Sequence, residues 1–230
     1  MSSTISRVQE ILEHDLDPEF VAEMAVAVGW AYADLHRRLA EMTGLTDCMR
    51  LEMFADQRSS AVVSAVAGVA KRRGVPFGFK RLSCNGQSKL LVKTGRLVFT
   101  QEPILTLGDA PRVADYKLEL SEAYGLSRQL ELDLGDVPGQ LADWCGQVFA
   151  VLLHGSFGAR FNERDRRLGA LMLAVPSAEY DRWITRADFS EIAIEGAPVA
   201  AQTRKESASQ SDRVVVSVRA SRKIRRTGDE

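Results

Sequence analysis

The hydrophobic period of this chain changes near residue 75, and this change limits the folds that it can adopt. Residues 18–43 repeat apolar side chains at helical spacing and follow Asp17, a residue typical of helix caps. Residues 59–73 form a stretch of small residues that ends in three cations and Gly74, which is typical of a helix terminus. The first third of the chain therefore predicts two helices.

The chain beyond the second predicted helix has the two-residue period of strands. Residues 77–84 and 87–93 flank Asn85-Gly86, the pair most typical of a two-residue hairpin turn with positive φ at both positions. Residues 96–101 continue this pattern as a third strand. Further strands are predicted at 50–54, 115–121, 128–134, 148–154 and 168–175, with short helices at 139–145 and 177–183.

A run of helices followed by a run of strands favours an α+β architecture, in which helices gather on one side of a sheet. We therefore expect a single α+β domain over residues 1–196. It would contain an antiparallel sheet of about six strands with helices packed on one face. Residues 197–230 are small, polar and then basic, so they predict a flexible linker and basic tail, with residues 214–218 as a possible extra strand.

The charges are strongly segregated along the chain although the net charge is only -1. No acidic residue lies between Asp56 and Glu102, while both flanking regions are rich in carboxylates. A basic block of this kind creates a local positive field that attracts polyanions. The predicted nucleic-acid-binding residues are Lys71, Arg72, Arg73, Lys80, Arg81, Lys89, Lys93 and Arg96, together with Arg222, Lys223, Arg225 and Arg226 of the tail.

These charges predict a non-catalytic regulatory or accessory protein that binds a macromolecule, with nucleic acid as the favoured partner. The alternative interpretation of the basic block is a solvated sheet face whose cations balance the acidic helix at 18–43. A second alternative is a protein-binding neutralising partner of antitoxin type.

The main catalytic alternative is a metal-dependent nuclease. Asp115-Tyr116-Lys117 supplies the acid–x–Lys pair that such enzymes place on a strand to hold a metal and polarise water, but no clearly placed acid precedes it. Alternating charges on the wet face of a strand explain the same residues. His154, at the end of an apolar strand, is expected to be a structural hydrogen-bonding residue.

Metal and cofactor sites lack support in the sequence. The three histidines have no paired spacing, and the three cysteines are far apart without a CxxC pair. No Gly-rich phosphate loop is present, so no metal and no cofactor are expected. The chain also lacks an apolar run long enough for a membrane span and a secretory signal, which predicts a cytoplasmic protein without membrane contact.

Overall fold

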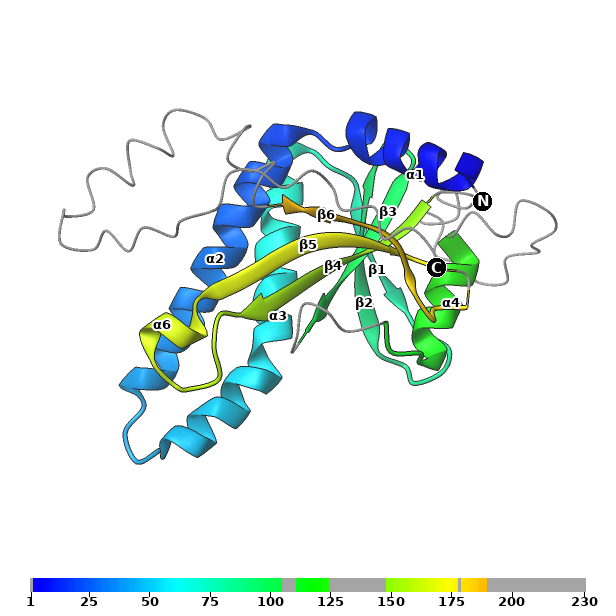
Figure 1. The fold of residues 1–230 in the computed structure, drawn as a ribbon. Coiled ribbons are helices and arrows are strands. Elements are labelled where there is room, and N and C mark those ends of the chain that lie inside the picture. Colours follow the sequence, from blue (N-terminus) through cyan, green and yellow to red (C-terminus); the bar gives the residue numbers. More distant parts are fainter. Residues whose placement is uncertain (1, 105–110, 125–147, 178, 190–230) are drawn as a thin grey trace.

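The computed structural model describes residues 2–104, 111–124, 148–177 and 179–189 (Figure 1). Its helices are α1 (Ser2–Asp15), α2 (Pro18–Glu41), α3 (Asp47–Arg73), α4 (Asp115–Tyr124) and α6 (Glu163–Arg166). Its strands are β1 (Phe77–Arg81), β2 (Ser88–Thr94), β3 (Leu97–Pro103), β4 (Val148–Ser156), β5 (Leu168–Pro176) and β6 (Trp183–Asp188). The elements predicted at 128–134, 139–145 and 197–230 lie outside the described residues.

Helix α2 begins and ends close to where its sequence predicts. The side chain of Asp17 accepts a hydrogen bond from the backbone N–H of Glu19, and Pro18 occupies the first turn. Its buried positions follow the helical apolar repeat, from Phe20 to Leu39. The prediction of a core-facing amphipathic helix is thus confirmed.

Helix α3 is longer than predicted. It begins at Asp47, after Thr46 caps it by accepting a hydrogen bond from Met49, and it ends as expected at Gly74 with φ 67°. The prediction of a strand at 50–54 was therefore wrong. The alternating apolar residues there are too few to define a period, and the helical repeat that includes Phe54 continues through the whole segment.

The six strands form one sheet in the order β1-β2-β3-β4-β5-β6. All neighbouring pairs are antiparallel except β3 and β4, which are parallel, with Gln101 opposite Leu152. The prediction of an antiparallel sheet was correct for four pairings and wrong for this one. The long connection between β3 and β4, which contains α4, returns the chain to the same end of the sheet, as a parallel pair requires.

The segment 115–121 was predicted to be a strand but forms helix α4. Its apolar residues alternate, yet the buried positions Lys117, Leu120 and Ser121 have helical spacing. Helix α4 packs on the sheet face opposite the N-terminal helices. The prediction that helices pack on one face describes α2 and α3 but does not include α4, which contacts the other face.

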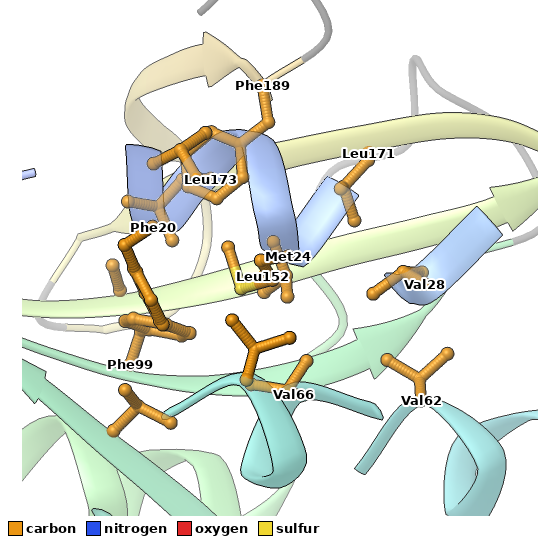
Figure 2. Packing of buried hydrophobic residues seen from close by; sticks show 14 of the residues in the cluster. Phe20, Met24, Val28, Val62, Val66, Phe99, Leu152, Leu171, Leu173 and Phe189 are labelled. Carbon is orange, nitrogen blue, oxygen red and sulfur yellow. The ribbon is translucent and has the colours of Figure 1, made fainter. Parts of the chain in front are cut away.

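The sheet is buried on both sides. On one side Val62 and Val66 of α3 and Met24 of α2 pack against Phe99 and Leu152 of the sheet (Figure 2). On the other side a second cluster joins the alternate strand residues to α4 and to the loop after β5: Leu91, Val98, Phe149, Val151, Leu153, Leu120 and Tyr180. The central strands therefore read as almost continuous apolar runs.

The hairpin between β1 and β2 is present, but its turn differs from the prediction. Leu82 donates its backbone N–H to Gln87 across a longer loop, and only Gly86 has positive φ, at 67°. Asn85 instead uses its side-chain oxygen to accept the N–H of Gln87. The turn is therefore not the two-residue type that Asn85-Gly86 predicted, because the asparagine stabilises a wider loop through its side chain.

A helix was predicted at 177–183, but residues 179–182 form a loop that leads into β6. The hydroxyl of Ser177 accepts the N–H of Asp181, and Tyr180 adopts φ 59°. Ser177 thus stabilises a local turn in place of a helix N-terminus. Among the described residues no helix is long and apolar enough to cross a membrane.

Replacing Gly95 with alanine is expected to destabilise the fold by about 2–4 kcal/mol. Gly95 has φ 52°, and an added Cβ would lie 2.6 Å from the Asp15 carboxylate. Gly44→Ala is the matched control, since Gly44 has φ 80° with open space around it, and about 1–2 kcal/mol is expected there. Urea denaturation measures both losses, and equal losses would contradict a close contact between Asp15 and the turn.

Candidate nucleic-acid interface

The cations at the end of α3 face carboxylates of α2. Arg72 and Arg73 bind the two oxygens of Glu23 at 2.8 and 2.6 Å, and Arg73 also binds Glu19 at 2.7 Å. Burial opposes ionisation of Glu23, but the hydrogen bonds from Arg73 and Arg72 outweigh it and lower the pKa of its carboxyl. These two predicted phosphate contacts therefore join the long helices to each other.

Arg96 has a similar role at the turn between β2 and β3. Its backbone N–H, Nε and Nη2 all donate to the carboxylate of Asp15, at the end of α1, and Glu10 lies 3.6 Å from Nη1. The hydrogen bond from the Arg96 side chain holds the pKa of Asp15 below its ordinary value. Arg96 thus attaches α1 to the sheet.

Two lysines of the basic block face α4. Lys80 lies 3.6 Å from Glu119, and the ammonium of Lys89 lies 4.6 Å from the centre of the Tyr116 ring. Lys89 is half-buried, and burial lowers the pKa of its ammonium. Alternation along β2 also places Lys93 on this face of the sheet.

Two of the predicted binding residues in the described part of the chain are exposed without a carboxylate partner there: Lys71 at the end of α3 and Arg81 at the end of β1. The structure therefore does not gather the basic block on one open surface. Instead it distributes these cations over the end of α3, strands β1 and β2, and the β2–β3 turn. The four tail cations, Arg222, Lys223, Arg225 and Arg226, lie outside the described residues.

A different basic segment, the connection between β4 and β5, carries an exposed aromatic side chain. Phe157 is 61% exposed, and the guanidinium of Arg164 lies 5.4 Å from its ring centre. Within the described part of the chain Arg160 and Arg164 are exposed and have no carboxylate partner, whereas Arg167 is paired with Glu163 at 2.5 Å.

This connection is internally braced. The backbone N–H groups of Phe157 and Gly158 donate to Arg167 and Asp165, and the Asp165 carboxylate accepts the N–H of Arg160. Asn162 caps the single turn of α6. The sequence signal was the density of arginines beside a Phe-Gly pair. It was missed because neighbouring acids cancel much of the formal charge.

Beside this connection, a chain of hydrogen bonds crosses the interior from α2 to α3. Tyr32 Oη lies 2.6 Å from Nδ1 of His154, and His154 Nε2 lies 2.6 Å from Oε1 of Gln101. The amide of Gln101 donates to Ser59 Oγ at 2.8 Å. The expectation that His154 is a structural hydrogen-bonding residue is confirmed.

The direction of these hydrogen bonds follows from the donors available. Gln101 uses its amide nitrogen on Ser59, so its carbonyl oxygen faces His154 and accepts from Nε2–H. Nδ1 of His154 then accepts the Tyr32 hydroxyl proton. Burial, and secondly the charge of Arg58, lower the pKa of His154 to about 3, so the imidazole is neutral.

The acid–x–Lys pair of the nuclease alternative lies on helix α4, where a strand was expected. Lys117 is buried and binds Glu102 at 2.5 Å, and Tyr116 donates to the same carboxylate. The described residues contain no group of three His, Cys, Asp or Glu side chains that could hold a metal ion. The geometry of α4 therefore offers an ion pair in place of a metal centre.

Comparisons with protein-family models, with curated proteins and with solved structures found no match to this chain.

Acidification is expected to destabilise the folded protein through His154. The imidazole has a pKa of about 6.5 in an unfolded chain and about 3 in the fold. Between these values the unfolded state binds more protons, so the free energy of unfolding falls as the pH falls, by up to about 1.4 kcal/mol per pH unit.

Urea denaturation from neutral pH to about pH 4 tests this linkage. In the His154→Gln variant, the free energy of unfolding should lack the pH dependence that arises from protonation of this one imidazole. The pH dependence that arises from other groups should resemble that of the wild type. NMR of the wild-type imidazole gives an independent readout, because a ring that titrates near neutral pH in the folded protein would contradict the burial argument.

Proposed function

We propose that this protein is a non-catalytic nucleic-acid-binding accessory protein that holds single strands at the connection between β4 and β5. The observation that carries the proposal is the exposed Phe157 ring beside Arg160 and Arg164, two exposed arginines without carboxylate partners in the described structure. Proteins that bind single strands combine cations for the phosphates with aromatic rings on which bases stack.

The bracing of this connection supports such a role. Because backbone hydrogen bonds and the Asp165 carboxylate fix the loop, little conformational entropy is lost when a strand binds. Arg164 already lies near the Phe157 ring, so a base and its phosphate could be contacted together. An unpaired base is favoured over a duplex because its ring face is accessible for stacking.

The basic block has a smaller part in this proposal than the sequence suggested. Arg72, Arg73 and Arg96 are engaged by carboxylates of the protein itself, and breaking those pairs to bind phosphate would weaken the fold. Lys71 and Arg81 remain as secondary phosphate contacts. The tail cations are proposed to add sequence-independent attraction.

A protein partner is the second candidate function, and one observation on α2 favours it. Trp30 is 69% exposed and Val26, one turn earlier on the same helix face, is 44% exposed. Large exposed aromatics are enriched at protein interfaces. This candidate would be supported if the wild type binds a protein partner and the Trp30→Ala variant does not, while both bind nucleic acid with the same affinity.

The nucleic-acid proposal is tested by fluorescence anisotropy with a labelled single-stranded oligonucleotide. Arg160→Gln with Arg164→Gln is expected to weaken binding about tenfold or more and to reduce the slope of log K against log salt by about 1.4, for two phosphates. The matched double variant Lys71→Gln with Arg81→Gln is expected to have a smaller effect. A larger effect in that control would place the interface on the basic block.

Stacking is tested separately with paired aromatic substitutions. Phe157→Ala is expected to weaken binding by about 1–3 kcal/mol, the usual contribution of one base stacked on an aromatic ring. Phe79, on edge strand β1, is 51% exposed and provides the control, since Phe79→Ala should leave the affinity unchanged. If Phe157→Ala binds like the wild type, the aromatic part of the proposal is wrong.

A further inference from the structure

Two arginines meet beside the buried hydrogen-bond chain, and neither forms an ion pair within the described structure. Arg166, on α6, is only 7% exposed; it donates to the backbone oxygen of Gly158 and lies over the Phe54 ring at 5.3 Å. Arg58, on α3, is partly exposed. Arg58 lies one helical turn after Phe54 on α3, which places it near the Arg166 guanidinium over that ring. Burial and the charge of Arg58 lower the pKa of Arg166, whereas the charge of Asp165 raises it.

The hydrogen-bonding groups around these arginines are incompletely satisfied. The Nε atoms of Arg58 and Arg166 are buried and have no hydrogen-bond partner among the described residues. A buried charge is ordinarily paired, because removing it from water without a counter-charge is very unfavourable. Two adjacent cations without a counterion are therefore an unusual feature that needs a cause.

The surrounding residues supply only part of the counter-charge for the two arginines. Tyr32 and His154 are neutral, since burial raises the pKa of the tyrosine and lowers that of the histidine. The negative charge of Asp165 raises the pKa of Arg166, but its carboxylate accepts the backbone N–H of Arg160 and forms no ion pair with Arg166 in the described structure. The local charge thus remains positive.

We propose that Arg58 and Arg166 form a binding site for one phosphate-type oxyanion between α3 and the β4–β5 connection. The guanidinium groups would donate through their Nε–H groups, which lack partners, together with the adjacent Nη–H groups, and the partly exposed Arg58 would form the entrance. Guanidinium forks match phosphate oxygens in bidentate geometry, and a dianion balances two cations. This site is separate from the Phe157 surface and does not depend on nucleic-acid binding there.

The test is isothermal titration calorimetry of the full chain with inorganic phosphate, at constant ionic strength, with chloride as the reference salt. Saturable binding with one phosphate per chain is expected. Arg58→Met and Arg166→Met should each weaken it about tenfold or more, as loss of charge-assisted hydrogen bonds implies. Arg37→Met is the control, because Arg37 is an exposed arginine already paired with Asp34 and should bind phosphate like the wild type.

The outcomes distinguish loss of the phosphate site from loss of folding and from binding at the Phe157 surface. Arg58→Met keeps the test decisive if Arg166→Met fails to fold, since Arg58 is partly exposed. No saturable binding by the wild type, or equal binding by wild type and Arg58→Met, would overturn the proposal. Comparing 5′-phosphorylated with 5′-hydroxyl oligonucleotides then identifies the source: preference for the former indicates a strand end, and equal affinity indicates free phosphate.

Discussion

The hydrogen bonds of His154 join elements of the fold that are far apart in the sequence. Gln101 lies on β3 and His154 on β4. These two strands are parallel neighbours, and a long connecting segment separates them in the sequence. Tyr32 and Ser59 add the two long helices to the same hydrogen-bond chain. One buried imidazole thus links β3 and β4 to the two long helices, α2 and α3.

This polar chain also restricts how β3 and β4 can pair. Side chains alternate between the faces of a sheet, so a shift by one residue would turn His154 toward the apolar cluster beneath α4, where its hydrogen-bonding partners are absent. An unsatisfied buried imidazole is strongly unfavourable. The otherwise apolar strand Val148–Ser156 would accept other registers with little penalty, and His154 removes that freedom.

Local features of the sequence predicted local features of the fold. Asp17-Pro18 and Gly74 marked helix ends correctly, and the apolar runs at 148–154 and 168–175 are strands. The errors arose where short segments fit two periods, as in α4, or where one side chain stabilises a loop, as Asn85 does. The parallel pairing of β3 and β4 depends on contacts between distant segments, which periodicity does not report.

Charge patterning along the sequence is a limited guide to the binding residues for a related reason. Charge counted along the chain treats Arg72, Arg73 and Arg96 as free cations, but folding brings Glu23, Glu19 and Asp15 from distant segments to pair with them. Conversely, Glu163 and Asp165 offset the charge of the arginines in the β4–β5 connection when residues are counted along the sequence. In the fold, Arg160 and Arg164 are nevertheless exposed. Which cations remain available to a ligand is a property of the fold.

The position at which a polyanion contacts the protein surface can be measured directly by NMR chemical-shift mapping. The protein would be labelled with ¹⁵N and titrated with a short unlabelled single-stranded oligonucleotide. The account predicts that the largest shifts occur at the amides of Phe157, Arg160 and Arg164, with small changes at Lys93 and Arg96. Shifts concentrated on the β1–β3 strands, or no saturable shifts at all, would contradict it.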